Sequence, residues 1–181
     1  IGSSVIISQC LGAGQKGKMK TAVFTTLINF FVVSICLGAL GLFLNHRILG
    51  WVNTPQEVFP DAALYLAIYF AGLPFLFMYN VEASIFNALG DSRTPLYLLI
   101  FSSLLNIFLD MVFVIRFQQG VRGVAIGTLI AQGVSAVISF WLLLRKLKKY
   151  ETDEHWRLYD TGLMFSMVRI AVPSIIQQSI V

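Results

Sequence analysis

The chain has 181 residues, of which 57% are apolar and only 12% are charged. An ordinary soluble domain is about 45–50% apolar and about 25% charged, so this chain lacks the charge to cover a water-facing surface. The composition excludes a soluble enzyme, a nucleic-acid-binding domain and a disordered tail. It predicts a protein that spans a lipid bilayer, in which the net charge of +4 marks the loops that face the cytoplasm.

Long apolar runs predict where the chain crosses the membrane. A spanning helix requires roughly 20 mostly apolar residues, and the runs here are continuous, whereas the strands of a membrane β-barrel alternate. We therefore expect an all-α integral membrane protein, a polytopic transmembrane helix bundle. Both terminal helices are expected to be incomplete, because the chain begins and ends inside apolar runs. Complete spans are expected at 21–44, 62–89, 95–115 and 123–144, and partial ones at 1–11 and 168–181.

The basic residues are distributed unevenly among the loops. Ten of the 13 Lys and Arg residues lie in or beside the loops that follow the first, third and fifth apolar runs. The positive-inside rule places these loops in the cytoplasm and the loop at 45–61 outside. Residues 151–167 mix charged and large apolar side chains, which favours a helix lying in the cytoplasmic interface. A plain solvated linker is the alternative for this segment.

Polar groups at membrane depth suggest a cation site. Asn106 and Asp110 are four residues apart, so they share one face of their helix. If the chain reverses near residue 120, Thr128 lies at nearly the depth of Asp110, and Gln132 faces Asn106. Carboxylate, amide and hydroxyl oxygens suit a hard cation such as Na⁺, and a desolvated carboxylate can instead bind a proton. The alternative is that Asp110 is a structural acid.

A second acid, Glu82, also falls inside a complete span. It lies about two turns from the predicted cytoplasmic end, with Asn80 nearby, so it is either part of a secondary polar site with Asn80 and Gln132 or an acid solvated from that side. The next-to-last run carries a stripe of small residues, which is typical of close helix packing. The stripe consists of Gly123, Gly127, Ala131, Ser135 and Ser139.

Enzyme motifs are absent from the sequence. It contains no HExxH, no nucleophile elbow and no P-loop. His46 and His155 are expected on opposite sides of the membrane, so they cannot share a metal or a catalytic site. We therefore expect no enzymatic activity, no organic cofactor and no nucleic-acid partner.

Five motifs in order along the chain resemble the multidrug and toxic compound extrusion (MATE) transporters. The most specific is LNIFLD at 105–110 followed by GVRGVA at 120–125. The resemblance covers essentially the whole chain, from the end of that family's second helix to the start of its seventh. The other motifs are QCLGAG at 9–14, GLPF at 72–75, ALGDSRTP at 88–95 and VPSIIQQ at 172–178.

The resemblance implies an architecture and an activity that the spacings alone do not. Such transporters have two six-helix lobes in the cell membrane and export cationic or amphipathic organic compounds in exchange for inward Na⁺ or H⁺. Residues 1–150 would form most of the amino-terminal lobe, 151–167 a cytoplasmic linker, and 168–181 the start of the carboxy-terminal lobe. The partners would be the lipid bilayer, small organic substrates and the remainder of the same transporter.

The resemblance also implies a cation site at Asn106, Asp110 and Thr128, with Asp110 as the coupling carboxylate. The family's site includes an acid on the first helix, which has no counterpart in this sequence. A flippase for lipid-linked sugars is one alternative, but it would need basic residues to hold a pyrophosphate, and the complete spans contain none. A non-transporting structural membrane subunit is the other, and it predicts that Asp110 tolerates replacement by Asn.

Overall fold

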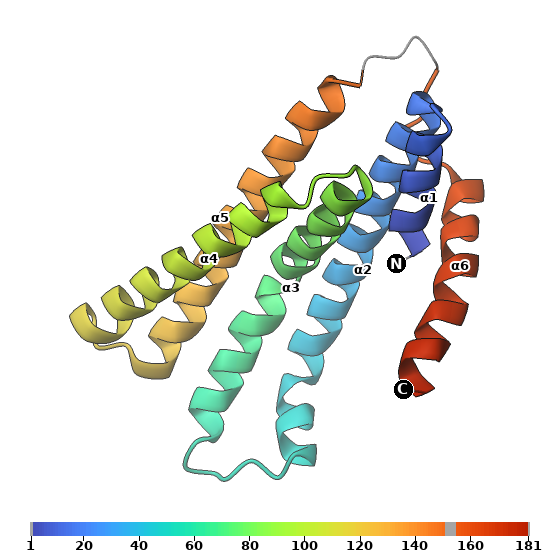
Figure 1. Ribbon diagram of the computed structural model, residues 1–181. Coiled ribbons are helices and arrows are strands. Elements are labelled where there is room, and N and C mark those ends of the chain that lie inside the picture. The colour runs from blue at the N-terminus through green and yellow to red at the C-terminus, as the bar shows by residue number, and fades with distance from the viewer. Residues whose placement is uncertain (1, 151–154, 181) are drawn as a thin grey trace.

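Seven helical elements make up the part of the chain that the computed structural model describes, residues 2–150 and 155–180. No strand occurs in these residues, and the predicted all-α fold is confirmed. Figure 1 shows a bundle in which α2, α3 and α5 run alongside one another and α4 packs against α5. The elements are α1 (Gly2–Gly12), α2 (Lys16–Trp51), α3 (Phe59–Ala88), α4 (Arg93–Met111), the π-helical turn η1 (Val112–Arg116), α5 (Gly120–Lys148) and α6 (Thr161–Ile180).

Four of these segments are long and apolar enough to cross a membrane: α2, α3, α4 together with η1, and α5. They correspond to the four complete spans that the sequence predicts, but their ends differ. α2 has 36 residues, roughly 54 Å at 1.5 Å per residue, which exceeds the roughly 30 Å of bilayer hydrocarbon. The outer loop expected at 45–61 therefore shortens to residues 52–58. The Asn45 amide ties this end of α2 to α3 by donating to the Ala63 carbonyl oxygen (2.8 Å).

The backbones of α2 and α3 approach closely near the middle of the bundle. Pro74 lacks an N–H, so the carbonyl oxygen of Phe70, four residues earlier, has no helical donor at that position. A Cβ on residue 38 would lie only 2.8 Å from that oxygen, and one on residue 41 would collide with the Phe70 ring. Gly38 and Gly41 therefore allow α2 to pack directly against the segment of α3 that Pro74 interrupts.

The apolar core lies at the end of the bundle that carries residues 13–15, 89–92 and 155–160, here called the inner end (Figure 1, toward the top). α1, α2, α3, α5 and α6 all contribute side chains to this core. By contrast, Leu98 is the one buried residue of α4, and most of the other apolar side chains of this helix are exposed. The largest fully buried apolar side chains of this core are Ile7, Met19, Val23, Ile85, Phe86 and Leu143.

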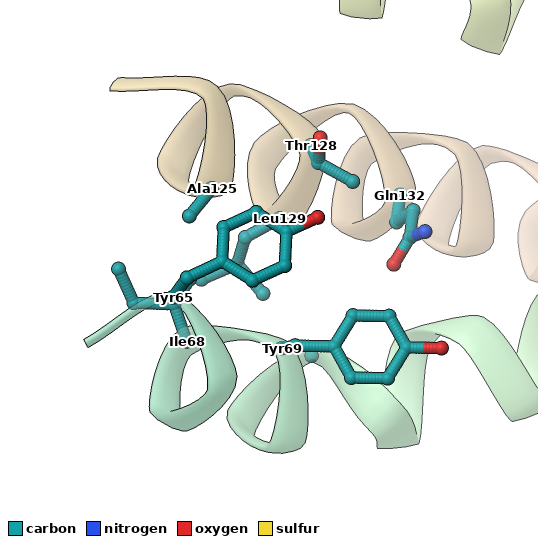
Figure 2. A pocket seen from close by; sticks show the side chains of 8 residues that line it. Tyr65, Ile68, Tyr69, Ala125, Thr128, Leu129 and Gln132 are labelled. Carbon is teal, nitrogen blue, oxygen red and sulfur yellow. The ribbon is translucent and has the colours of Figure 1, made fainter. Parts of the chain in front are cut away.

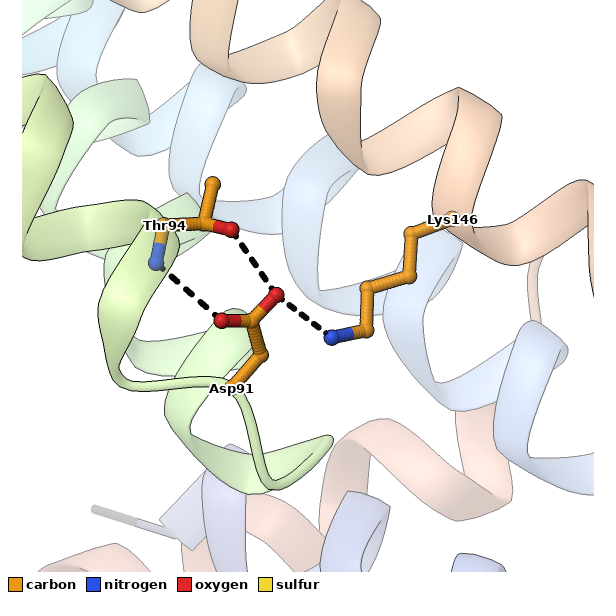
Figure 3. A network of polar contacts seen from close by, with 3 residues as sticks. All are labelled: Asp91, Thr94 and Lys146. Atoms are coloured by element: carbon orange, nitrogen blue, oxygen red, sulfur yellow. Dashed lines mark hydrogen bonds and ion pairs between the residues drawn. The ribbon is translucent and has the colours of Figure 1, made fainter.

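An ion pair joins the α3–α4 loop to α5 at the inner end (Figure 3). The Lys146 ammonium lies 2.7 Å from Asp91 Oδ2, and Thr94 donates to the same carboxyl from its backbone N–H (3.1 Å) and its hydroxyl (2.8 Å). Partial burial alone would raise the pKa of Asp91, but the hydrogen bonds from Lys146 and Thr94 outweigh it and lower the pKa to about 2. The carboxyl is therefore charged at neutral pH and holds the two segments together.

Residues 155–160, here called the strap, cross the inner half of α2 as a non-helical segment. The Arg157 N–H donates to Thr21 Oγ1 (3.0 Å). The Asp160 N–H donates to Thr25 Oγ1 (3.1 Å). Both threonines are buried, so the strap satisfies hydroxyl groups inside the fold as well as its own backbone donors.

The strap differs from the helix expected at 151–167. Residues 151–154 lie outside the described residues, 155–160 are irregular, and 161–167 are helical only as the first turns of α6. The reason is contact with α2. Threonine hydroxyls of α2 accept backbone N–H groups that a helix would have bonded internally. In addition, Trp156 stacks on Phe24 of α2, with the ring centroids 5.3 Å apart. Residues 155–160 are therefore not part of an interfacial helix but a non-helical segment docked on α2.

Candidate cation site

The three residues of the predicted site come from two adjacent helices, α4 and α5. The Asn106 amide of α4 donates to Thr128 Oγ1 of α5 over 3.2 Å. Asp110 lies one turn further along α4, toward η1, and its carboxyl packs against Gly127, the residue before Thr128. The amide–hydroxyl bond and the carboxylate therefore lie about one helical turn apart on the same contact between the two helices.

One oxygen of Asp110 is left without a protein partner. Oδ1 is buried, and none of the described residues donates a hydrogen bond to it. Asp110 as a whole is only partly buried, but a buried carboxylate oxygen without a donor is still unfavourable. A proton on the carboxyl or a cation beside it would remove this cost, and the neighbouring amide and hydroxyl oxygens are suitable additional ligands for a hard cation.

The pairing across the two helices differs by about one turn from the expected one. Asn106 bonds to Thr128 rather than facing Gln132. The π-helical turn η1 uses about one residue more per turn than an α-helix, which accounts for the one-residue shift of Asp110 from Thr128 to Gly127 but not for the full turn at Asn106. Asp110 therefore lies nearer the outer end than a uniform 1.5 Å rise implies, and it meets the earlier residue Gly127 of α5.

Gln132 faces α3 instead of α4. Figure 2 shows its amide directed toward α3, across from Tyr69, while the Thr128 hydroxyl points away from α3. Gln132, Thr128, Tyr65, Tyr69 and other α3 and α5 side chains line a cleft with about 10 Å³ of open space. This is about the volume that one water molecule requires, so the cleft admits water or a small ion and excludes an organic compound.

The structure does not bring together Glu82, Asn80 and Gln132, the residues of the expected secondary polar site. Glu82 and Asn80 are two residues apart, which separates them by roughly 200° around the helix. Asn80 donates to the Leu76 carbonyl oxygen (2.7 Å) and lines a different cavity from Glu82. Gln132 lies beside Gly72 of α3, roughly 15 Å along α3 from Glu82.

Gly127 also belongs to the site, although the sequence-based prediction does not place it there. A Cβ at this position would collide with Asp110 Oδ1 and lie 3.4 Å from the Asp110 backbone nitrogen. The small-residue stripe is interpreted from the sequence as packing alone. One feature of the sequence could have indicated its role. Gly127 stands next to the predicted ligand Thr128, at the predicted depth of Asp110 on the neighbouring helix.

These features define a polytopic integral membrane protein with a cluster of polar side chains inside its helix bundle. The chain belongs to the MatE family, whose sequence profile matches residues 1–112. The resemblance that the motifs indicate is thereby confirmed.

Curated relatives and solved structures agree with this assignment. The chain is 33% identical over 173 residues to the probable multidrug resistance protein YpnP of Bacillus subtilis (strain 168), covering 92% of this chain and 38% of that protein. It is 30% identical over 187 residues to the probable multidrug resistance protein YoeA of the same strain, covering 99% of this chain and 40% of that protein. The chain thus spans about 40% of the length of these relatives.

The solved structures that match share the fold. The outward-facing conformation of a multidrug resistance MATE family transporter of the MOP superfamily has a TM-score of 0.85 at 23% identity, over 98% of this chain and 40% of that one. An inward-facing conformation with the same family description has a TM-score of 0.79 at 20% identity, over 96% and 40% of the two chains.

Proposed function

We propose that this chain forms most of one lobe of a multi-pass transporter that exports cationic or amphipathic organic compounds in exchange for inward Na⁺ or H⁺. The remainder of the transporter would supply the second lobe, and the cell membrane would be its location. Support for efflux comes from the relatives named as multidrug resistance proteins. In this proposal the transporter is not an enzyme and needs no organic cofactor.

The observation that carries the proposed coupling is the position of the Asp110 carboxyl. It packs against Gly127, the residue before Thr128, within a spanning segment, and its buried Oδ1 accepts no hydrogen bond from a described residue. A cation or a proton bound there would be driven inward by the membrane potential, at about 2.3 kcal/mol per charge per 100 mV. Hard divalent cations take six or more oxygen ligands, so by analogy Na⁺ would need water or further protein oxygens beside these three side chains.

The test is efflux of a fluorescent cationic dye from cells that express the complete transporter. Asp110→Asn keeps the shape of the side chain and removes its charge, so we expect folding to be nearly unchanged and cation-coupled efflux to be lost. Thr128→Ala removes one neutral ligand, and we expect a smaller loss of coupling. Asp61→Asn, which changes an exposed acid at the outer end of α3, is the matched control and should transport like the parent.

Two results would decide against the proposal. If Asp110→Asn transports like the parent while Na⁺ and pH are varied independently, the carboxyl is structural. If Asp61→Asn loses coupling as fully as Asp110→Asn, the loss reflects overall charge and does not locate the site at Asp110.

A further inference from the structure

The end of α5 carries a dense set of basic residues beside the spanning part of the bundle. Arg145, Lys146 and Lys148 lie in its last turn, and Lys149 follows directly. Since α5 is long and apolar enough to cross a membrane, these side chains lie where its apolar length ends. This is the level at which the headgroups of a lipid leaflet begin.

An open pocket of about 460 Å³, here called the basic pocket, lies between the end of α5 and the α3–α4 loop. Its positive charge comes from Arg145, Lys146 and Lys149 of α5, and Asp91 is the one acid among its described lining residues. The pocket therefore combines cationic side chains with an apolar wall. That wall is formed by Phe86, Leu142 and Tyr150.

The acid of the basic pocket is already neutralised. Asp91 is paired with Lys146 and accepts two hydrogen bonds from Thr94 (Figure 3). By contrast, no acid in the described part of the chain forms an ion pair with Arg145 or Lys149. Two positive charges of the pocket are therefore available to an anion from outside these residues.

Exposed apolar side chains continue from the basic pocket along α4 and α5. Leu96 and Tyr97 in the first turns of α4 are exposed, as is Trp141 of α5, whose ring holds the Arg145 guanidinium 3.5 Å from its centroid. Tryptophan and tyrosine are enriched where a membrane meets water. α6 packs against α1 and α2, on the opposite side of the bundle from α4 (Figure 1), so it does not cover these side chains.

We propose that the basic pocket binds the phosphate group of an anionic phospholipid in the leaflet at the inner end, with Arg145 and Lys149 as its ligands. Basic pockets between spanning helices suit such headgroups because they supply the complementary charge. The planar guanidinium of Arg145 can donate two parallel hydrogen bonds to a phosphate. The apolar wall and the exposed side chains of α4 favour a lipid over a free phosphate, because they would contact its acyl chains.

Lipid binding to the purified, delipidated complete transporter in a neutral detergent tests the proposal, with bound lipid counted by native mass spectrometry. Dioleoylphosphatidylglycerol is the anionic probe and dioleoylphosphatidylcholine the zwitterionic one. Each basic residue near an anionic lipid favours binding by about fivefold, so we expect the parent to bind phosphatidylglycerol roughly tenfold more tightly or better. Glycerol phosphate, which has the phosphate but no acyl chains, should not displace it at equal concentration.

Two pairs of substitutions separate the basic pocket from the general charge of the inner end. Arg145→Gln combined with Lys149→Gln should reduce the preference for phosphatidylglycerol to about twofold or less. Lys18→Gln combined with Arg157→Gln is the matched control, because it removes two charges from exposed residues of the inner end that do not line the pocket; it should keep the preference. If the first pair fails to fold, Lys149→Gln alone, at an exposed position, should weaken phosphatidylglycerol binding by about fivefold.

The inference is overturned if the parent binds both lipids equally, or if the pocket variant that folds keeps the full preference. An equal loss in the control pair also overturns it, because that pattern indicates surface charge without a built site. Displacement by glycerol phosphate at equal concentration would indicate a free-phosphate site and rejects the lipid. These measurements do not depend on the proposed function, since Asp110 does not line the basic pocket and Asp110→Asn should bind phosphatidylglycerol like the parent.

Discussion

Gly127 determines how closely the Asp110 carboxyl can approach α5, since a side chain at this position would occupy the place of Oδ1. The polar residues of the candidate site could be predicted from their spacing and from the family resemblance. Their pairing could not, because Asn106 bonds to Thr128 rather than facing Gln132 and the π-helical turn η1 changes the register next to Asp110. The sequence shows which side chains could bind a cation. It does not show which residues of α4 lie opposite which residues of α5, because that alignment depends on local backbone geometry.

At the same scale, the Asp91–Lys146 pair makes stability at the inner end depend on pH. The pKa of Asp91 is lowered to about 2 in the folded protein, from an ordinary value of 3.8. The stabilisation is therefore fully present above about pH 4 and is lost as the pH falls toward 2. We expect Asp91→Asn to lower the Tm of the complete transporter at pH 7, by roughly 2 °C for a partly exposed pair.

The check is thermal unfolding of parent and Asp91→Asn across this pH range. The difference in Tm should stay constant from pH 7 to about pH 4 and shrink below that. A difference that disappears between pH 7 and pH 5 would contradict a lowered pKa for this carboxyl.

At the scale of elements, the packing of α2 on α3 depends on a backbone contact rather than on side-chain volume. We expect Gly38→Ala to destabilise the protein by roughly 1–3 kcal/mol, because its Cβ would be forced against the Phe70 carbonyl oxygen. The same change at Gly50, where a Cβ meets nothing within 4 Å, should be neutral or slightly stabilising, since Ala favours a helix.

Thermal stability and folding yield of the two alanine variants provide the measurement. Equal stability of Gly38→Ala and Gly50→Ala would mean that α2 and α3 do not touch at this point. Gly50→Ala is a suitable control for Gly38→Ala, because both variants make the same change within α2.

The four spanning elements could be predicted, because a helix that crosses the lipid needs a long run of apolar residues and the sequence shows four such runs. Their ends could not, because α2 continues to Trp51 through residues that a hydropathy criterion excludes. The strap was also beyond prediction: its backbone donors are satisfied by Thr21 and Thr25, more than 130 residues earlier in the chain. The hydropathy of a sequence does not indicate hydrogen bonds between segments so far apart in the chain.

At the scale of the whole molecule, most of the basic residues gather at one end, where the start of α2, the start of α4, the end of α5 and the strap carry them. Residues 13–15, 89–92 and the strap lie at the inner end, and residues 52–58 lie at the opposite one (Figure 1). This arrangement is what the positive-inside rule requires of a bundle with its inner end in the cytoplasm. The orientation itself stays a prediction.

Labelling of single cysteines in intact cells tests that orientation. In a variant whose Cys10 and Cys36 are replaced by Ala, we expect Asn53→Cys to react with a membrane-impermeant thiol reagent. Lys18→Cys should react only after the cells are permeabilised. The opposite pattern would place the inner end outside the cell.

The strap also connects the start of α6 to α2. Besides its two threonine contacts, it donates a hydrogen bond from the Tyr159 hydroxyl to Asn29 Oδ1 (3.0 Å), and Asp160 accepts the N–H of Leu163 at the start of α6 (3.0 Å). α6 is thus fastened through the strap to the inner half of α2, so a displacement of α6 is transmitted to α2 or breaks these bonds. α6 also packs directly against α1, where Gly2 lies against the Met167 carbonyl and Ala171, so both α1 and α2 are placed to follow any displacement of α6.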